Sequence, residues 1–287
     1  MTLIDLHTHT SASDGTDSPA ELIAKAHAAG LAAVAVTDHN TVAGLDEAEE
    51  AGRALNIVVI RGCEISAFTE HGEMHILGLW LPRDLGPLQK RLRCLRAKRA
   101  ERNVRIVERL RAIGLDVSME EVRDEACCEN VGRTHIAAAL LRRGYVGNVR
   151  EAFSRYLEVQ ERAYLPKDVM TPEEAVRSLA GLGATVSLAH PMLKKYSAGR
   201  PENFVARLAG CGLSALEAWH SEQTKADTRA CRAIAERFGL GLSGGSDYHG
   251  ANKPGLQLGV GYGGLRVGCD VLEGLMHMRR AAGLPCP

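Results

Sequence analysis

Aromatic residues are scarce in this chain, where Phe, Trp and Tyr together make up 4% of the 287 residues. Few rings are therefore available to stack on a base, which limits how a nucleotide could be recognised. Excess charge is also absent, because 35 basic residues balance 35 acidic residues. A chain without net charge is not a general polyanion binder, although a local basic patch is compatible with this balance.

Long apolar runs are absent as well. No segment is long enough to span a bilayer, and no signal-peptide pattern precedes the first predicted strand at Leu3. The eight cysteines form no C-x-x-C pair, and most of them lie in apolar or helical contexts. We therefore expect reduced thiols, a cytoplasmic location and no membrane partner.

The chain does contain an alternation of short apolar runs and helical segments. Ser18-Pro19-Ala20-Glu21 is typical of a helix start, with a serine cap, a proline at the first position and a glutamate that closes a capping box. Thr171-Pro172-Glu173-Glu174 has the same features. About seven apolar runs alternate with helices, which predicts an α/β fold with a mostly parallel sheet. The pattern alone leaves a barrel and an open sheet as alternatives.

This alternation stops between residues 82 and 162, where the chain is rich in arginine and helical throughout, and it resumes afterwards. We therefore predict that residues 1–81 and 163–287 form the α/β domain. Residues 82–162 are predicted to form an inserted helical subdomain.

The placement of the eleven histidines carries the functional signal. In His7-Thr8-His9, at the end of the first predicted strand, alternate side chains project to the same side, so two imidazoles lie next to each other. Other potential ligands also lie at or just past the carboxyl ends of predicted strands: His39, Glu64, His190, His220, Asp247 and His249. In a βα barrel these ends converge on one face, where active sites are built.

The candidate metal ligands are imidazoles and carboxylates, with no thiolate among them. They are His7, His9, Asp14, Asp38, His39, Glu64, His75, His190, Asp247 and His249. This donor set favours Mn²⁺, with Fe²⁺ or Zn²⁺ as alternatives, over a structural zinc site of the cysteine type. It is too large for one ion, so we predict two or three divalent ions that share a bridging carboxylate. Clustered ions suit phosphoryl transfer because they activate water near neutral pH and neutralise charge on the reacting oxygens.

Arginines interrupt an apolar helical stripe in the insertion. At the helical period the stripe contains Leu88, Leu92, Leu95, Arg99, Arg102, Ile106, Leu110 and Ile113. An arginine on such a face must reach solvent or bind an anion. Two interpretations stay open: a solvated basic helix that breaks near Ala97, or a face that caps the metal site and offers guanidinium groups to a phosphate.

Further basic residues raise the same question. Arg133 and His135 lie in Gly132-Arg133-Thr134-His135 before a helix, where backbone N–H groups and a guanidinium can bind an anion. An ordinary helix cap is the alternative. Lys167 lies where the chain returns to the α/β domain; it either adds positive charge to the site or is an exposed linker residue.

Taken together, six motifs resemble the PHP (polymerase and histidinol phosphatase) family of metal-dependent phosphoesterases. In chain order they are Asp5-Leu6-His7-Thr8-His9, Thr37-Asp38-His39, Gly62-Cys63-Glu64-Ile65, Met74-His75-Ile76-Leu77-Gly78, Leu188-Ala189-His190-Pro191 and Ser246-Asp247-Tyr248-His249. The resemblance covers the chain outside the insertion. It implies a distorted (β/α)7 barrel with a trinuclear metal site.

The resemblance also implies a role for each ligand. One ion would be held by His7, His9, Glu64 and Asp247, a second by Glu64, His75 and His190, and a third by Asp14, His39 and His249. Many relatives have a histidine where Asp14 stands, so the third site is more anionic here. We expect Asp38 to orient a ligand imidazole. We expect His220 or His190 to protonate the leaving oxygen, with a substrate contact as the other role for His220.

The insertion sharpens the resemblance to the TrpH/YciV-like subgroup of the family, through Gly132-Arg133-Thr134-His135 and Tyr164-Leu165-Pro166-Lys167. Members of that subgroup include phosphatases of nucleoside 3′,5′-bisphosphates such as pAp and 5′–3′ exonucleases of short RNA. The resemblance implies removal of the 3′-phosphate of pAp here, with the exonuclease as the alternative. The expected substrate-binding residues are Arg99, Arg102, Arg133, His135, Lys167 and His220.

The expected partner is therefore a small nucleotide or a short RNA, and not DNA. A non-catalytic PHP module is the alternative from another class of function. Such a module would have lost metal ligands, whereas every ligand position is filled in this chain. A histidinol-phosphate phosphatase would leave the arginine-rich insertion without a purpose.

Overall fold

The structure is a computed structural model in which residues 2–70, 72–126, 131–158, 161–165, 169–193 and 201–286 are described. The chain divides into two compact units. Met1–Gln89 together with Met170–Pro287 form the first, called here the barrel unit, and Lys90–Val169 form the second, called here the helical unit. The insertion expected at residues 82–162 begins and ends a few residues before the helical unit.

A single sheet of seven strands forms the centre of the barrel unit, and the strands are neighbours in chain order. They are β1 (Ile4–Asp5), β2 (Ala33–Val36), β3 (Val58–Thr69), β4 (Gly72–Leu79), β5 (Thr185–Leu188), β6 (Ala215–His220) and β7 (Gly241–Gly245). Backbone hydrogen bonds also join the two ends of the sheet, from Leu6 N–H to the Gly244 carbonyl (3.1 Å) and from Asp247 N–H to the His7 carbonyl (2.9 Å). The sheet is thus nearly closed, which confirms the predicted distorted barrel.

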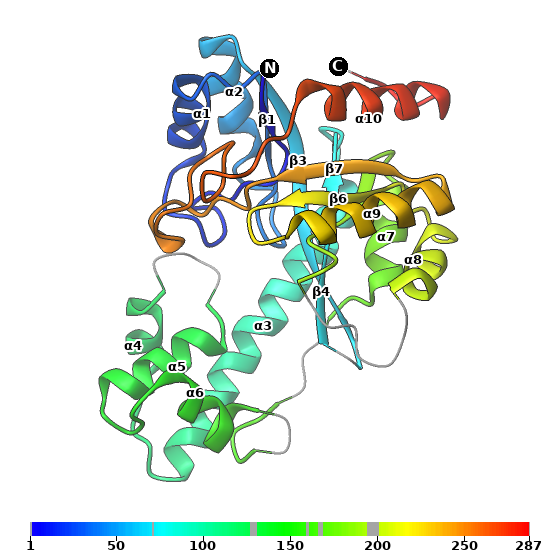
Figure 1. Cartoon of the computed structure of the whole chain (residues 1–287). Coiled ribbons are helices and arrows are strands. Elements are labelled where there is room, and N and C mark those ends of the chain that lie inside the picture. The colour runs from blue at the N-terminus through cyan, green and yellow to red at the C-terminus, as the bar shows by residue number, and fades with distance from the viewer. Residues whose placement is uncertain are drawn as a thin grey trace. The chain divides into compact units, whose positions relative to one another are not determined.

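Helices flank this sheet (Figure 1). They are α1 (Pro19–Ala28), α2 (Leu45–Leu55), α7 (Pro172–Ala180), α8 (Pro201–Ala209), α9 (Lys225–Phe238), the short 3-10 helix η2 (Gly250–Asn252) and α10 (Cys269–Ala281). The predicted capping box of α1 is present, because Ser18 Oγ accepts a hydrogen bond from Glu21 N–H and the Glu21 carboxylate accepts one from Ser18 N–H. Thr171 and Glu174 form the same pair at α7.

Strand β4 breaks the alternation of strands and helices, because it runs antiparallel to both β3 and β5. β3 continues past Glu64 to Thr69, and no helix separates it from β4. Glu64 therefore lies in the middle of a strand, whereas the sequence analysis placed it at a carboxyl end. The physical reason is that the two strands pair with each other continuously from Gly62 with Leu79 to Thr69 with Gly72, so β3 extends beyond the point where its pairing with β2 ends.

Apolar side chains fill the barrel unit. Every residue of β2 and β5 is buried, as expected for strands that are covered on both faces. Ile4, Leu6 and Ile60 share a buried cluster with Leu275 of α10. The strand ends that carry the polar residues are therefore attached to a rigid, close-packed support.

The helical unit consists of α3 (Gly86–Ala112, whose first residues belong to the barrel unit), α4 (Met119–Asp124), α5 (Arg133–Arg142), α6 (Val149–Ala152) and the π-helix η1 (Phe153–Leu157). It has its own core, which includes Ile106 and Leu110 of α3 and Ile136 and Leu140 of α5. α3 is continuous over 27 residues. The break near Ala97, which belonged to one of the two interpretations left open, is therefore absent, because apolar residues on both sides of it are buried along one stripe of a single helix.

Within the described ranges, no helix combines the length and the apolar character needed to cross a membrane. The cysteines of those ranges are free thiols, as expected: Cys63, Cys94, Cys211, Cys231, Cys269 and Cys286. Cys127 and Cys128 lie outside the described residues.

The closure of the barrel can be tested at Gly245. A Cβ atom at this position would lie 2.4 Å from the His7 nitrogen and 2.5 Å from the His7 Cβ. We expect Gly245→Ala to lower the free energy of unfolding by about 1–3 kcal/mol because the backbone must move, measured by urea denaturation. Gly274→Ala is the control, because a Cβ there meets nothing within 4 Å and alanine favours the helix interior by about 0.5–1 kcal/mol. Identical unfolding midpoints for Gly245→Ala and the native chain would contradict the tight closure.

Candidate metal centre

Three overlapping groups of imidazoles and carboxylates lie in the barrel unit, and within each group the ligand atoms are within 4.8 Å of one another. The groups are His7, His9, Glu64 and Asp247; His39, Glu64 and His75; and His9, Asp14, His39 and His249. The side chains come from β3, β4 and the segments that follow β1, β2 and β7. Closure of the barrel therefore brings together residues that are far apart in the chain.

Glu64 is the centre of this arrangement, and it is 1% exposed. Imidazole nitrogens surround both of its oxygens: His7 Nε2 (3.3 Å), His9 Nε2 (3.2 Å) and His39 Nδ1 (3.0 Å) lie near Oε2, and His75 Nδ1 (3.1 Å) and His190 Nε2 (3.3 Å) lie near Oε1. A carboxylate with ligand nitrogens around each oxygen has the geometry of a bridge between two cations.

His190 lies at the border of the second group. Its Nε2 is 3.2 Å from His75 Nδ1 as well as 3.3 Å from Glu64 Oε1. The structure thus brings together the three residues expected around the second ion, and it adds His39 as a neighbour of Glu64 and His75.

Several buried atoms in this cluster have no hydrogen-bond partner. They are His7 Nε2, both ring nitrogens of His9, His39 Nδ1 and Glu64 Oε2. Buried polar atoms in proteins are normally hydrogen-bonded, so a group of orphaned donor and acceptor atoms that face one another needs an explanation. Imidazole nitrogen and carboxylate oxygen are both ligands of divalent transition metals. The residues present therefore fit a site for divalent metal ions.

The electrostatics of the cluster also favour cations. Burial opposes ionisation of Glu64, but the imidazoles around it, His39 and His7 first among them, hold the pKa of its carboxyl well below the ordinary value. Burial lowers the pKa of His39 to about 3, so its ring is neutral at pH 7. Burial acts in the same direction on His9, but Asp247 and Glu64 outweigh it and raise the pKa of His9 to about 10.

Glu217 of β6 is a residue that the sequence analysis missed. It is fully buried, with Oε1 2.9 Å from His7 Nδ1, and its Oε2 accepts a hydrogen bond from His190 N–H (2.6 Å). A carboxylate at Nδ1 orients the His7 ring and leaves Nε2 directed at the cluster. The sequence did contain a signal, because this acid interrupts the buried apolar strand Ala215-Leu216-Glu217-Ala218.

Asp38 has a different contact from the one expected. In the described residues its carboxylate accepts hydrogen bonds from Thr10 N–H (2.8 Å), Thr10 Oγ1 (2.7 Å) and Ser13 Oγ (2.5 Å), and from no imidazole. It therefore fixes the turn that leads to Asp14. These hydrogen bonds hold a short polar loop in one conformation, so the Asp14 carboxylate has a defined position. Asp14 Oδ1 lies 3.4 Å from His249 Nε2.

Two basic side chains contact Asp247. His220 Nε2 lies 3.3 Å from Asp247 Oδ2, and Lys253 Nζ forms an ion pair with the same oxygen. Burial tends to lower the pKa of Lys253, but Asp247 raises it overall, so the ammonium is charged at neutral pH. Lys253 was also missed by the sequence analysis, since a lysine in a polar loop carries no distinguishing pattern.

The backbone is strained at two of these residues. His190 has φ +30° and Asp247 has φ +58°, in the left-handed region that costs about 1–3 kcal/mol for a residue other than glycine. Both conformations are held by hydrogen bonds of the backbone N–H, to Glu217 for His190 and to the His7 carbonyl for Asp247. Strain that the surrounding structure maintains is typical of functional sites.

The helical unit contains a separate cluster of guanidinium groups. Arg102 is half-buried and its Nε has no hydrogen-bond partner. Burial, followed by the charges of Arg133 and Arg99, lowers the pKa of Arg102 to about 10. The three arginines predicted to bind substrate therefore lie close enough to repel one another, and an anion would relieve that repulsion.

The other predicted substrate contacts differ from one another. Arg133 Nη1 donates a hydrogen bond to the Leu157 carbonyl (2.8 Å), and its guanidinium lies over the Phe153 ring. His135 Nδ1 accepts a hydrogen bond from Gly132 N–H (3.0 Å), so this side chain caps α5, the alternative that the sequence left open. Lys167 lies outside the described residues.

The PHP domain family model matches residues 5–163 of this chain. The chain belongs to the PHP family. Three relatives agree with this assignment: a 5′-3′ exoribonuclease of Haemophilus influenzae (32% identical over 245 residues, 85% of this chain and 89% of the relative), a 3′,5′-nucleoside bisphosphate phosphatase of Chromobacterium violaceum (31% over 264 residues, 90% and 91%) and a phosphoribosyl 1,2-cyclic phosphate 1,2-diphosphodiesterase of Eggerthella lenta (32% over 254 residues, 86% and 94%).

Solved structures agree with the family. A protein of Bifidobacterium adolescentis, described as a metal-dependent phosphoesterase, superposes with a TM-score of 0.77 at 30% identity and covers 96% of both chains. A Chromobacterium violaceum structure, described as an amidohydrolase with bound sulfate, has a TM-score of 0.74 at 31% identity and covers 90% of both. The PHP protein is thus a metal-dependent phosphoester hydrolase, and the relatives share that reaction class while differing in substrate.

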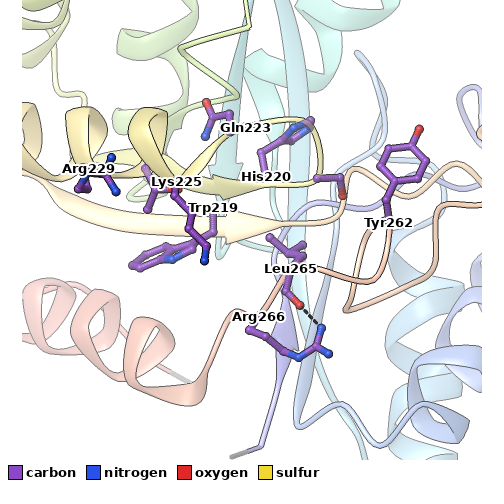
Figure 2. A pocket seen from close by; sticks show the side chains of 11 residues that line it. Trp219, His220, Gln223, Lys225, Arg229, Tyr262, Leu265 and Arg266 are labelled. Carbon is purple, nitrogen blue, oxygen red and sulfur yellow. Dashed lines mark hydrogen bonds between the residues drawn. The ribbon is translucent and has the colours of Figure 1, made fainter.

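A cavity of about 560 Å³ lies in the barrel unit of the PHP protein, beside His220 (Figure 2). On one side it is lined by Trp219 of β6 and Lys225 of α9, and on the other by Tyr262 and Arg266. The sequence analysis did not predict this cavity, because its walls come from segments that have no shared motif.

Glu217 is expected to act on the metal site through His7. We expect Glu217→Gln to weaken Mn²⁺ binding about 10–100-fold, because the amide is a poorer partner for the imidazole, as measured by metal titration of the chelated protein. Glu273→Gln, an exposed change on α10, is the matched control and should bind Mn²⁺ like the native chain. Unaltered Mn²⁺ affinity in a folded Glu217→Gln protein would show that this contact does not orient His7.

The raised pKa of His9 predicts proton release when metal binds. Without metal His9 retains its proton up to a pH of about 10, and a ring must be neutral to bind a cation. Metal affinity should therefore rise as the pH rises from 6 to 9. Calorimetry of Mn²⁺ binding in buffers with different ionisation enthalpies should show at least one proton released per chain at pH 7. No net proton release would contradict protonation of His9.

Proposed function

We propose that this PHP protein removes the 3′-phosphate from nucleoside 3′,5′-bisphosphates such as pAp, releasing phosphate and the nucleoside 5′-phosphate. One observation carries the proposal. Besides the imidazole–carboxylate cluster, the chain has a group of guanidinium side chains suited to bind an anion, formed by Arg99, Arg102 and Arg133. A guanidinium group is a suitable partner for a second phosphate. The name of the Chromobacterium violaceum relative, 3′,5′-nucleoside bisphosphate phosphatase, supports the same substrate class.

We assign the metal ions to three sets of ligands that overlap the three groups of imidazoles and carboxylates. His7, His9, Glu64 and Asp247 would hold the first, Glu64, His75 and His190 the second, and Asp14, His39 and His249 the third. The donor set favours Mn²⁺. When bound, such ions supply Lewis acidity at the phosphoryl group. We assign the second phosphate to the guanidinium groups on the basis of their charge.

His220 is the better of the two proposed general acids. Its Nδ1 accepts a hydrogen bond from Glu222 N–H (3.1 Å), so in the neutral ring the proton is on Nε2, the nitrogen beside Asp247. His220 can therefore direct an N–H at the leaving oxygen on the cluster side, and it would give up a proton there from its imidazolium form. His190 has its Nε2 between Glu64 and His75, which suits a metal ligand rather than a proton donor.

A 5′–3′ exonuclease that acts on short 5′-phosphorylated RNA is the second candidate. The cavity beside His220 favours it, because a mononucleotide needs no further site of this size. The Haemophilus influenzae relative, a 5′-3′ exoribonuclease, has the activity that this candidate requires. Both candidates use the same reaction at phosphorus and differ in the group that leaves. A non-catalytic module is disfavoured, because the ligand set is complete.

The activity itself is tested with pAp and the Mn²⁺-loaded protein. We expect phosphate release from pAp, and we expect Asp247→Ala to lower kcat/KM at least about 100-fold, because a ligand of the first group is lost. His9→Ala should have an effect of similar size. Glu273→Ala on the exposed face of α10 is the control. Absence of phosphate release from pAp by the native protein would refute the substrate assignment.

The role of the guanidinium cluster is tested by comparing two substrates. We expect Arg102→Gln to lower kcat/KM for pAp about 10–100-fold, the size of a lost charge-assisted hydrogen bond, and to leave the value for a nucleoside 3′-monophosphate nearly unaltered. Arg105→Gln removes an exposed arginine from the same helix and is the matched control. An equal loss on both substrates would mean that Arg102 does not bind the second phosphate.

A further inference from the structure

We infer that the cavity beside His220, lined by Trp219, Lys225, Arg229, Tyr262 and Arg266, is a nucleotide subsite that binds the next unit of a single-stranded RNA substrate. The inference rests on the proposed phosphoester hydrolysis at the imidazole–carboxylate cluster. The substrate class is then a single-stranded RNA that is longer than one nucleotide.

The charges around the cavity are those of an anion site. Lys225 and Arg229 of α9 and Arg266 of the following loop all line it, and its described walls include no carboxylate. None of the three cations forms an ion pair with a described acidic residue. The acid of the first turn of α9, Asp227, is occupied by hydrogen bonds from Thr224 N–H and Oγ1. A phosphate would therefore find cationic side chains that no internal partner neutralises.

Two of the chain's few aromatic side chains line the same cavity. Tyr262 is 55% exposed, the highest value among the exposed large hydrophobic residues that the structure describes. Trp219 is half-buried and packs on the barrel core. An exposed ring costs free energy in water unless it has a partner, and bases stack on such rings irrespective of sequence. Aromatic rings interleaved with cations are the combination that binds single-stranded nucleic acid.

The loop that carries Tyr262 is held in a defined shape. Gln257 and Gly261 exchange two backbone hydrogen bonds of 2.8 Å, and Leu265 N–H donates to the Val260 carbonyl. Gly261 has φ +59°, a conformation that a residue with a Cβ rarely adopts. Arg266 Nη1 donates to the Gly263 carbonyl (3.1 Å), so the guanidinium is also positioned by its own loop. Preorganised contacts lose little entropy when a ligand binds.

His220 connects the cavity with the metal cluster. It lines the cavity, and its Nε2 is 3.3 Å from Asp247 Oδ2. The cavity and the cluster are thus joined through one residue. That position suits the nucleotide that is joined through the reacting phosphate or follows it along the RNA, and pAp has no such unit.

The experiment compares pAp with a 5′-phosphorylated trinucleotide as substrates of the full-length, Mn²⁺-loaded protein. We expect Tyr262→Ala, and separately the double variant Lys225→Gln/Arg229→Gln, to lower the ratio of kcat/KM for the trinucleotide to kcat/KM for pAp about tenfold, the size of one lost stacking or charge contact. Arg232→Gln, an exposed change on α9 outside the cavity, should leave the ratio unaltered. A ratio that does not move in the cavity variants, or that falls equally in Arg232→Gln, would overturn the inference.

A binding measurement makes the inference independent of the proposed reaction. The chelated protein is titrated with a fluorescently labelled 5′-phosphorylated hexauridylate, which cannot be turned over without metal. We expect tighter binding by the native chain than by either cavity variant. We also expect the slope of the logarithm of the binding constant against the logarithm of the salt concentration to be shallower by about one to two in the double variant. If pAp hydrolysis fails but this binding difference is present, the proposed function is wrong and the subsite stands. Equal binding by all variants would remove the subsite and leave the proposed phosphatase untouched.

Discussion

The site depends on one buried carboxylate, Glu64, and on the imidazoles that surround it. A carboxylate with 1% exposure is costly to ionise unless positive or polar groups compensate for the lost water. Five histidine rings approach its two oxygens within 3.0 to 3.3 Å. These rings hold the charge in place, and the same geometry that stabilises the anion creates adjacent positions for cations. The same charge arrangement around Glu64 therefore serves both the stability of this end of the barrel and the binding of metal ions.

The barrel meets this requirement by bringing distant segments together and then holding them. Asp5 accepts hydrogen bonds from His7 N–H (3.3 Å), Ser246 N–H (2.8 Å) and Gly259 N–H (2.8 Å). One buried side chain thus joins the first strand, the end of β7 and the loop that leads to Tyr262. Glu217 acts similarly on His7 and His190. Neither acid is among the proposed metal ligands, yet Asp5 fixes the backbone of the segments that carry these ligands and Glu217 orients the His7 ring.

Reaction class and substrate choice are separated in this molecule. The imidazole–carboxylate cluster fits metal-dependent hydrolysis at phosphorus, and relatives with different substrates belong to the same family. Cationic surfaces outside the cluster are then left to select the substrate. The guanidinium cluster of the helical unit consists of arginines, with Arg133 over the Phe153 ring, whereas the cavity beside His220 is lined by cations together with the exposed ring of Tyr262. A second phosphate suits the former, and a stacked nucleotide suits the latter.

The sequence by itself indicated the reaction class and most of the residues that meet in the cluster, because HxH at a strand end and acids after apolar runs are local patterns. The barrel followed from the resemblance to the PHP family, since the alternation of strands and helices fits an open sheet as well. Tertiary structure alone decided the rest. Whether Glu64 lies within a strand depends on β4 running antiparallel, which is a long-range pairing that no local pattern encodes. Glu217 and the cavity beside His220 obtain their roles from neighbours that are distant in the chain, and Lys253 obtains its role from the ion pair with Asp247. Asp38 was expected to orient a ligand imidazole, but its carboxylate accepts hydrogen bonds from Thr10 and Ser13 of a turn instead. The partners of a carboxylate depend on packing, which a local motif does not encode. Local sequence patterns identify the side chains that a segment contains, whereas the contacts of those side chains are determined only when the barrel closes.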